Sequence, residues 1–514
     1  MKPTSLIVSL VLVNALAGCN KHSAPQQAIV SLVPATMQAT SEIDERFLAY
    51  NIEMVEVTGG RFWAPYIDGK AAKGDDRYEF RAPIDLTNPR LLKLATALAP
   101  SYARFSGTWA NATYFANTDT PPTNPPAGFD AVLTREQWRK AVAFSHQAGA
   151  DMLISLATSA GARDDKGEWQ PDNADQLFKY TESLGAHIAG AEFANEPNMI
   201  GLTQPPENYS PADYHRDYAH FYRWLKQRAP ETLVLAPGAV EMGEPMRTMA
   251  YLMGGNTFKP EQLVAEDSPK PDVFSFHFYG ASSQRCHIPL LGSYHADAFK
   301  PEWLASIDKG IARAKALRDH FAPHAPMWIT ESGETACGGN PWATTFSDVF
   351  RFLDQLARSA RQGVKVFAHN TLAASDYALL DEHNFAPRPN YWAAWLWRNL
   401  MGTTVLDPGT GAAGTNIYAH CHRSIPGAVS ALAVNVQQEA QKTLNVASAG
   451  TIYTLTAGEE GQHSAALNGI TLALGADDSF PQLEGRPFTA GEINLEPASV
   501  SFLVFSQLDN PACH

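Results

Sequence analysis

The fold of this chain is decided by two stretches, Ala-Glu-Phe-Ala-Asn-Glu-Pro-Asn at residues 191–198 and Pro-Met-Trp-Ile-Thr-Glu-Ser-Gly at residues 326–333. Each is an apolar run of strand length that stops at a turn-forming proline or glycine. Each run also carries a glutamate at its end, Glu196 in the first and Glu331 in the second. Because a carboxylate beside a buried strand is costly unless it is paired or used, the two glutamates predict a functional site shared by two strands.

A strand-like apolar run followed by a helix-like run recurs along the rest of the chain. The eight predicted strands are residues 47–53, 102–106, 151–157, 190–195, 232–237, 273–278, 327–331 and 364–370. Continuous apolar runs are typical of parallel strands that are covered on both faces. They predict an α/β fold with a (β/α)8 TIM barrel and enlarged loops. The alternative is an open doubly wound sheet, but Ile52-Glu53-Met54 stands where its glycine-rich phosphate turn is expected.

Helix start signals lie between the predicted strands. Thr134-Arg-Glu-Gln137 is a capping box ahead of an amphipathic run at 138–146. Ser210-Pro211 places a capping hydroxyl and an N1 proline ahead of a run at 214–228. These signals support helices after the predicted strands.

The pattern changes after about residue 403, where short alternating runs are separated by turns rich in glycine and aspartate. This predicts an antiparallel β-sandwich that follows the barrel. The predicted organisation is a signal segment at 1–19, a tether with a possible sandwich strand at 20–44, the barrel at 45–403 and the sandwich at 404–514.

The first residues have the layout of an export signal. Lys2 precedes an apolar run at 6–15 that is too short to span a bilayer as a helix. Leu16-Ala-Gly-Cys19 follows and resembles a bacterial lipobox, in which lipidated Cys19 anchors the chain without a spanning helix. A plain secretory signal is the alternative. We expect an exported bacterial protein that is periplasmic or held at the outer membrane by lipid.

The charge and the remaining cysteines narrow the functional classes. A formal charge of −14 argues against nucleic acid as a partner, because phosphate binding needs clustered basic residues. Four cysteines in an exported chain predict disulfides, and their spacing does not fit a zinc site. We favour Cys286–Cys337 and Cys421–Cys513, because each pair lies within one predicted domain; reduced thiols are the alternative. No metal or cofactor is expected, and we expect a monomer.

The two glutamates have the residue type of a retaining glycosidase pair. In the predicted barrel, Glu196 ends the fourth strand and Glu331 the seventh, at the face where barrel enzymes build their sites. A retaining mechanism needs two carboxyl groups about 5–5.5 Å apart. Glu196 is predicted to be the acid/base and Glu331 the nucleophile. Glu334 is a rival nucleophile, but it falls in a loop, where a solvated charge is the default expectation.

Neighbouring side chains complete the predicted site. The amide of Asn195 is placed to hydrogen-bond a sugar 2-hydroxyl. Tyr279 or His277, at the end of the sixth strand, is predicted to donate to the nucleophile and keep it ionised. Tyr279 is the favoured donor, because His277 could equally be a core histidine whose hydrogen bonds are satisfied within the fold.

Several motifs resemble the heparanase family, glycoside hydrolase family 79 of clan A, and in particular its bacterial β-glucuronidase and heparanase branch. They are Asn195-Glu-Pro-Asn198, Tyr102-Ala-Arg-Phe-Ser-Gly-Thr108, His277-Phe-Tyr279, Trp328-Ile-Thr-Glu331, Cys337-Gly-Gly-Asn340 and the stretch from Leu379 through Asp381-Glu-His-Asn-Phe to Tyr391-Trp392. The likeness runs from about residue 45 to 405.

The resemblance implies a retaining hydrolase that acts on an oligo- or polysaccharide containing β-linked glucuronic acid. It implies Glu196 as acid/base and Glu331 as nucleophile. It also implies that the uronate carboxylate meets the backbone N–H groups of Gly338 and Gly339 and the hydroxyl of Tyr377. The other sugar-binding residues expected are Glu53, Thr108, Asn195 and Tyr279, with His277 beside them.

The chain departs from the animal enzyme, since it has neither the excised linker nor basic clusters that would grip sulfated saccharides. Exo- and endo-β-glucuronidase activity therefore both remain open. Two further alternatives are another clan A β-glycosidase, such as a β-xylosidase or β-glucosidase, and a surface lipoprotein that binds glycans without cleaving them.

Overall fold

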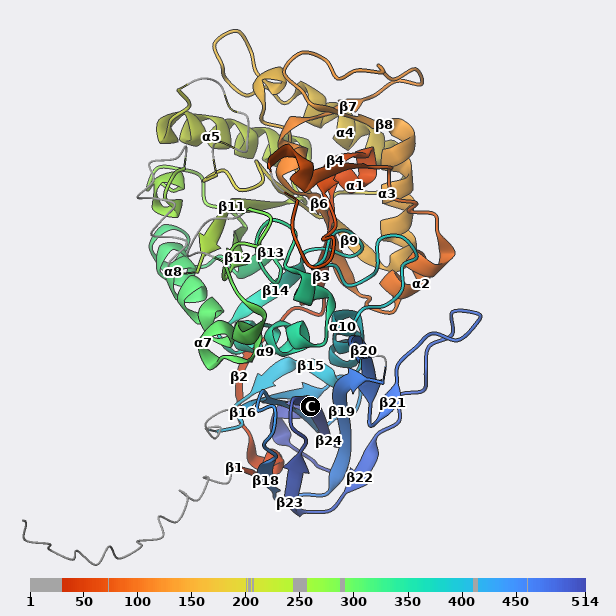
Figure 1. Ribbon diagram of the computed structural model, residues 1–514. Coiled ribbons are helices and arrows are strands. Elements are labelled where there is room, and N and C mark those ends of the chain that lie inside the picture. Colours follow the sequence, from red (N-terminus) through yellow and green to blue (C-terminus); the bar gives the residue numbers. More distant parts are fainter. Residues whose placement is uncertain are drawn as a thin grey trace, which may run out of the picture.

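A computed structural model describes residues 30–72, 74–199, 201, 205, 208–243, 257–286, 292–409, 415–459 and 461–514. The predicted export signal, including Cys19, lies outside the described residues. Figure 1 shows a barrel ringed by helices and, below it, a smaller unit of antiparallel strands. Helices α9 and α10 lie between the two.

The barrel is a closed sheet of eight parallel strands, so the predicted fold class is confirmed. The strands are β3 (Leu48–Glu53), β6 (Ser101–Ser106), β9 (Ala150–Ser155), β10 (Gly190–Glu192), β11 (Leu233–Met242), β12 (Val273–Tyr279), β13 (Met327–Ser332) and β14 (Val364–His369). Pairing of β14 with β3 closes the barrel, with Phe367 opposite Leu48. Each predicted strand overlaps one barrel strand, although β10 ends at Glu192 rather than at Asn195.

Helices cover the outside of the barrel, and two of them begin at the expected capping residues, Thr134 and Ser210. The main ones are α2 (Pro89–Thr96), α3 (Arg135–Ala148), α4 (Asp172–Ser183), α5 (Pro211–Arg228), α8 (Ser306–Phe321), α9 (Ser347–Arg361) and α10 (Pro389–Leu400). At α3, the Thr134 hydroxyl accepts from the Gln137 N–H, and the Gln137 side chain accepts from the Thr134 N–H, at 3.2 and 2.9 Å. Among the described residues, no helix has the length and hydrophobicity needed to cross a bilayer.

The barrel interior is apolar at one end and polar at the other. An apolar layer that includes Leu153, Val273 and Val366 fills the end where the strands begin, and there the rings of Tyr102 and Trp328 lie 5.0 Å apart. At the end where the strands finish, the buried side chains are polar or charged: Glu53, Arg104, Ser106, Ser155, Glu192, His277 and Glu331. The fold therefore gathers buried charge at the C-terminal mouth of the barrel, where barrel enzymes place their sites.

The lower unit contains a nine-stranded sheet and a three-stranded sheet. Its strands from the C-terminal part of the chain are β15 (Met401–Leu406), β16 (Thr415–His422), β17 (Val429–Asn435), β18 (Lys442–Val446), β19 (Gly450–Gly458), β20 (Gly461–Leu467), β21 (Ile470–Thr471), β22 (Arg486–Phe488), β23 (Gly491–Leu495) and β24 (Ser499–Phe505). Two strands come from before the barrel: β1 (Val30–Leu32) pairs with β18, and β2 (Ala39–Glu42) pairs with β15. The barrel thus lies, in sequence, between strands of the same sheets.

Two disulfides join distant parts of the chain. Cys286 pairs with Cys337, which connects the loop after β12 to the loop after β13. Cys421 of β16 pairs with Cys513 in the last turn of the chain. The first disulfide lies at the barrel mouth, and the second lies within the lower unit.

Candidate active site

The structure brings Glu196 and Glu331 together at the mouth of the barrel. One carboxylate oxygen of Glu196, one of Glu331 and a ring nitrogen of His277 all lie within 4.8 Å of one another. This separation is close to the spacing of about 5–5.5 Å between the carboxyl groups of retaining glycosidases. The geometry therefore permits one carboxyl group to protonate a glycosidic oxygen while the other reaches the anomeric carbon.

Each glutamate is aimed by an irregularity in the backbone. Glu196 lies in the bend after β10 with φ of 48°, a left-handed conformation that non-glycine residues rarely adopt. At Glu331 the pairing of β12 with β13 slips by one residue, so that Glu331 stands opposite His277. Such slips re-aim side chains at sheet ends. Backbone strain and bulges of this kind are common at functional sites.

Arg104 lies at the centre of the site with 1% of its surface exposed. Its Nη1 donates to Oε2 of Glu331 at 3.1 Å, and its Nη2 donates to Oε2 of Glu192 at 2.7 Å. Nη2 also donates to Oδ1 of Asn195 at 2.9 Å. One buried cation thus compensates two buried carboxylates. Arg104 was not predicted as a site residue, although an arginine inside the apolar run of the second strand is a detectable signal.

Glu192 is the permanent counter-ion of Arg104. Burial alone would raise the pKa of Glu192, but the charge of Arg104 brings this pKa below its ordinary value. The Ser155 hydroxyl donates to the same carboxylate oxygen at 2.8 Å. Glu192 therefore stays ionised and holds Arg104 in place. It was also missed from the sequence, because the predicted strand ran on to Asn195 and so placed Glu192 in its interior, whereas β10 ends at Glu192.

Glu331 accepts a hydrogen bond on each carboxylate oxygen. The Tyr279 hydroxyl donates to Oε1 at 2.8 Å, and Arg104 donates to Oε2. Burial, together with the charge of Glu331, raises the pKa of Tyr279 well above its ordinary value, so this hydroxyl keeps its proton. Donors to both oxygens stabilise the carboxylate form that a nucleophile requires.

His277 donates to Glu196 rather than to Glu331, so its predicted role as an alternative donor to the nucleophile is wrong. Its Nε2 lies 3.1 Å from Nη2 of Arg104, a group that can only donate. Nε2 must then accept, and the ring proton sits on Nδ1, which lies 3.0 Å from Oε1 of Glu196 and 3.7 Å from Glu331. Burial lowers the pKa of His277 to about 4, so the ring is neutral above that pH.

Glu196 has the environment of a proton donor. Burial raises its pKa to about 7, against the opposing charge of Arg104. A pKa near neutral pH lets a carboxyl group both give up and take back a proton during one catalytic cycle. The two glutamates thus have different surroundings: Glu196 receives the neutral His277 ring, whereas Glu331 receives the Tyr279 hydroxyl and the charged Arg104.

Glu53 lies close to Glu331, as expected from its place at the end of the first strand. Its Oε1 accepts from Nδ2 of Asn370 at 3.0 Å, and burial followed by the charge of Glu331 raises its pKa well above the ordinary value. A Cβ atom at Gly107, where φ is 85°, would come within 1.4 Å of Oε2 of Glu53. Only glycine therefore fits beneath this carboxyl group. Thr108 follows directly, half-buried at the start of a 3-10 turn, Thr108–Ala112.

Asn370 connects three of the predicted substrate-binding residues. Besides Glu53, its Nδ2 reaches the hydroxyl of Tyr279 at 3.1 Å and that of Tyr377 at 2.9 Å. Tyr377 lies in the loop after β14 and is 3% exposed. The structure therefore places Tyr377 in one hydrogen-bonded cluster with Glu53 and Tyr279, joined by Asn370, which was not selected from the sequence.

Asn195 is held so that its amide nitrogen is left to donate. Its Oδ1 accepts from Arg104 and from the Ser106 hydroxyl, at 2.9 and 3.1 Å. Its backbone N–H and carbonyl are both bound by the side chain of Asn111, at 2.9 and 3.0 Å. With the oxygen and the backbone occupied, the NH2 group is available for a sugar hydroxyl, as predicted for this position.

The loop after β13 has the geometry of an anion-binding site. Cys337, Gly338 and Gly339 are consecutive left-handed residues with φ of 66°, 81° and 78°. Both glycines are buried, and their N–H groups meet no protein acceptor among the described residues. Successive N–H groups in such a turn form a concave site for a carboxylate or phosphate. Gly339 also packs closely against Tyr377, because a Cβ there would lie 3.0 Å from the Tyr377 nitrogen.

Glu334 is buried, so the expectation of a solvated loop charge is wrong. It is 1% exposed and accepts from the Asn340 N–H at 2.8 Å, the Thr335 hydroxyl at 2.7 Å and Nε1 of Trp342 at 3.1 Å. Burial raises its pKa. Its oxygens are thus occupied in shaping the loop that carries Gly338 and Gly339.

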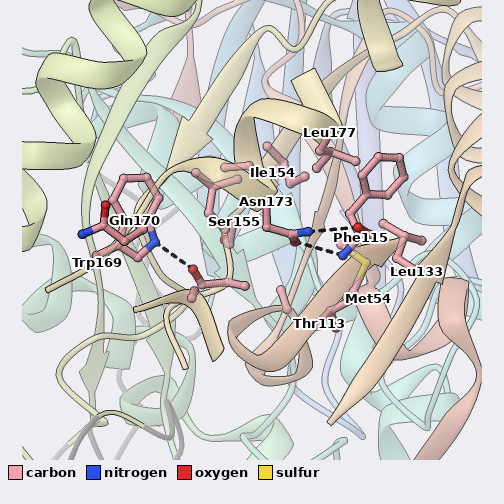
Figure 2. Close-up of a pocket in the computed structure, with 15 residues that line it drawn as sticks. Met54, Thr113, Phe115, Leu133, Ile154, Ser155, Trp169, Gln170, Asn173 and Leu177 are labelled. Atoms are coloured by element: carbon pink, nitrogen blue, oxygen red, sulfur yellow. Dashed lines mark hydrogen bonds between the residues drawn. The ribbon is translucent and has the colours of Figure 1, made fainter. Parts of the chain in front are cut away.

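A small cavity lies beside the site and is separate from it (Figure 2). Its volume is about 30 Å³, room for one or two waters but not for a sugar. Its walls are mainly apolar, and Asn173 bridges both backbone groups of Phe115 at 2.9 Å. One lining residue, Ser155, also belongs to the charged site, because its hydroxyl donates to Glu192.

Glu196, His277 and Glu331 also have the donor types of a metal site. Arg104 already donates to Glu331 and lies against His277. A divalent cation at this position would meet a fixed positive charge, so the arrangement fits proton transfer and nucleophilic attack better.

No family model matches this chain. Among curated proteins, it is 25% identical to heparanase-like protein 1 of Arabidopsis thaliana and 24% identical to heparanase of Mus musculus, and both alignments cover 96% of each chain. It is 24% identical to baicalin-beta-D-glucuronidase of Scutellaria baicalensis, over 84% of this chain and 86% of that protein. Inactive heparanase-2 of Homo sapiens is 25% identical over 74% of this chain and 66% of that protein.

Solved structures of glycoside hydrolases share the fold. A 4-O-alpha-L-rhamnosyl-beta-D-glucuronidase from Fusarium oxysporum has a TM-score of 0.62 at 14% identity, with 93% of this chain and all of that chain covered. An alpha-L-arabinofuranosidase from Thermotoga maritima also has a TM-score of 0.62, at 13% identity over 93% of this chain and 99% of that chain. The resemblance to the heparanase and β-glucuronidase family is thus confirmed, and these relatives support a glycoside hydrolase. One relative is named inactive, so likeness alone does not decide activity.

Proposed function

We propose that this chain, which resembles heparanases over nearly its whole length, is a retaining glycoside hydrolase that cleaves β-linked glucuronic acid. The observation that carries the proposal is the pair Glu196 and Glu331, with oxygens within 4.8 Å of one another and with unequal surroundings. The glucuronidase and heparanase relatives support the same reaction class.

In the proposed first step, Glu331 attacks the anomeric carbon while Glu196 gives its proton to the departing glycosidic oxygen. The carbon–oxygen bond to the aglycone breaks, and a covalent glycosyl ester forms on Glu331. Arg104 and Tyr279 hold the attacking carboxylate. The NH2 group of Asn195 is placed to bind the sugar 2-hydroxyl, an interaction that strengthens as positive charge develops on the ring.

In the second step, Glu196 acts as a base. It takes a proton from water, and the resulting hydroxide attacks the anomeric carbon from the face that the aglycone left. The ester bond breaks, Glu331 returns as a carboxylate, and the sugar leaves with its β configuration retained. Glu196 is then protonated again for the next cycle.

Uronate selectivity is assigned to the turn at Gly338 and Gly339. Two buried N–H groups that meet no acceptor in the described part of the chain suit the carboxylate of the sugar, and Gly339 packs against Tyr377. A neutral 6-hydroxyl would leave this donor set poorly matched. Unmatched buried polar groups are the strongest source of discrimination between substrates.

A substrate panel tests the proposed selectivity. The expected result is that kcat/KM for an aryl β-glucuronide exceeds that for the matching β-glucoside and β-xyloside by at least about a hundredfold. Comparable rates on all three would instead indicate another β-glycosidase of the same fold. Heparan fragments of defined length, followed by analysis of product size, separate exo from endo cleavage.

The pH dependence tests the role of Glu196. Because its pKa is about 7 and the protonated form is the donor, kcat/KM on an aryl glucuronide is expected to fall as pH rises above about 7, by about tenfold per unit at the limit. His277 is neutral through this range and does not contribute to the fall. A glucuronide with a leaving group that needs no proton should lack this alkaline limb. An alkaline limb of equal size for both substrates would contradict the assignment.

A second candidate function is glycan binding without cleavage, which the inactive human relative favours. It predicts retained binding of glucuronides with no turnover and no covalent ester on Glu331.

We also propose export and lipid anchoring at Cys19, on the sequence alone, with membrane contact only through the lipid. Monomeric state remains a prediction.

A further inference from the structure

Arg285 is a second buried arginine at the barrel mouth, 4% exposed, in the loop after β12. All of its donating nitrogens are occupied by protein groups. Nε donates to the Ala64 carbonyl at 2.8 Å, and Nη2 pairs with the carboxylate of Asp376. Nη1 donates to the carbonyls of Gly338 and Gly339 at 3.1 and 2.9 Å. Because the side chain is buried and each of its nitrogens donates to a protein group, we expect any effect of Arg285 on substrate to pass through these partners.

The partners of Arg285 belong to separate loops at the barrel mouth. Ala64 follows the hairpin strand β4 (Gly60–Trp63), Gly338 and Gly339 follow β13, and Asp376 precedes Tyr377 in the loop after β14. The guanidinium also lies over the Tyr66 ring, 4.0 Å from its centroid. One planar group thus joins these loops to its own, and lysine could not reproduce this geometry.

These contacts determine the direction of the turn at Gly338. The Gly338 carbonyl also accepts from the Ser375 hydroxyl at 2.9 Å, and the Gly339 carbonyl accepts from the Tyr66 hydroxyl at 2.9 Å. The next N–H, of Asn340, is bound to Glu334. With these carbonyls and the Asn340 N–H bound, the N–H groups of Gly338 and Gly339 are among the turn's donors that meet no acceptor within the described residues.

The Cys286–Cys337 disulfide adds a covalent restraint to the same turn. Cys286 follows Arg285 directly, and Cys337 precedes Gly338. The Cys337 carbonyl also accepts from the Ser283 hydroxyl at 2.8 Å. The loop that carries Arg285 and the turn that carries the two N–H groups are thus joined by side-chain hydrogen bonds and by one disulfide.

We propose that Arg285 is a positioning residue for uronate selectivity, which it exerts by holding the carbonyls of residues 337–339 so that the N–H groups of Gly338 and Gly339 face the sugar carboxylate. The inference rests on the proposed function, since it assumes a uronate in this pocket. Arg285 does not touch the substrate. Its loss should weaken recognition of the carboxylate while leaving Glu196 and Glu331 in place.

The test compares wild type with Arg285→Met on an aryl β-glucuronide and the matching β-glucoside. The ratio of their kcat/KM values is expected to fall by about tenfold to a hundredfold, mainly through a higher KM for the glucuronide, because two hydrogen bonds to a charged group are misplaced. Tyr66→Phe removes one contact to the Gly339 carbonyl and keeps the ring. Tyr66→Phe should lower the same ratio of kcat/KM values by several-fold. It tests the inference even if Arg285→Met does not fold.

Arg163 provides a matched control. It is equally buried, pairs with Asp217, lies over the Tyr209 ring at 4.7 Å and donates to the carbonyls of Thr158 and Gly167, away from residues 337–339. Arg163→Met should lower stability without changing the ratio. An unchanged ratio in folded Arg285→Met or Tyr66→Phe, with a wild type that prefers glucuronides, overturns this inference alone. A wild type without that preference overturns the proposed function instead.

Discussion

Glu331→Gln is expected to lower kcat/KM on an aryl β-glucuronide by at least about 10⁴-fold, because the variant cannot form the glycosyl ester. The amide is nearly the same size as the carboxylate, so folding should be retained. Tyr279 and Arg104 would remain beside the position, but the attacking atom would lack its negative charge. The measurement is steady-state turnover, with circular dichroism and thermal melting to show that the variant is folded.

Added azide distinguishes the nucleophile from the acid/base. In Glu331→Ala, azide can occupy the vacated space and attack directly, which gives an α-glucuronyl azide. In Glu196→Ala, azide replaces the activated water after the ester has formed on Glu331, which gives a β-glucuronyl azide. The anomeric configuration of the product, read by NMR, therefore assigns the two roles independently of the size of the rate loss.

Glu334→Gln is the matched control for both variants, since Glu334 lies three residues beyond Glu331 and is also buried. It should lose some stability, because the carboxylate has several donors, and should give no azide product. If Glu334→Ala instead gave the α-azide and Glu331→Gln kept its turnover, the nucleophile assignment would be refuted. Full activity in Glu331→Gln and Glu196→Gln would reject the retaining mechanism as a whole.

Arg104→Met should have the largest combined effect on stability and activity. It leaves the carboxylates of Glu192 and Glu331 buried without a cation. Breaking a buried ion pair by removing one partner typically costs about 3–5 kcal/mol of folding free energy. Turnover should also fall by about a hundredfold or more, because Glu331, Asn195 and His277 lose their common donor. Denaturant unfolding and kcat/KM on the same preparation give both quantities.

The double variant Arg104→Met/Glu192→Gln separates these two effects. Neutralising Glu192 removes one uncompensated charge, so part of the lost stability should return while turnover stays low. Arg351→Met supplies the control, since it breaks an equally buried pair with Asp348 in α9, outside the site. Recovery of turnover together with stability in the double variant would mean that Arg104 serves only the fold.

The barrel was predictable because each of its strands is a continuous apolar run bounded by polar or turn-forming residues. The ends of the strands were harder to predict. β10 stops at Glu192, before the predicted end at Asn195, and β11 extends to Met242, beyond the predicted end at Pro237. Glu196 and Glu331 could be selected because strand ends converge at one face of a barrel. Their distance from each other depends on a strained φ and a register slip, which no local pattern reports.

The residues missed share a physical cause. The roles of these residues depend on contacts with partners on other strands, which lie far away in the sequence. They are Arg104, Glu192 and Asn370. Glu334 was expected to be solvated because it falls in a loop. The structure buries it because Asn340 and Trp342 fold back onto it. His277 was assigned the wrong acceptor, since its orientation is decided by Arg104, a donor that the sequence analysis had not selected.

The pairing of β1 with β18 and of β2 with β15 affects how this protein can be made. Ser31 and Asn445 touch across a separation of 414 residues. During synthesis, β1 and β2 have no partner strand until the whole barrel has been made. An open strand edge of this kind is a template for aggregation, and closing so long a loop is slow. A polypeptide that stalls anywhere before β18 therefore keeps β1 without its partner strand.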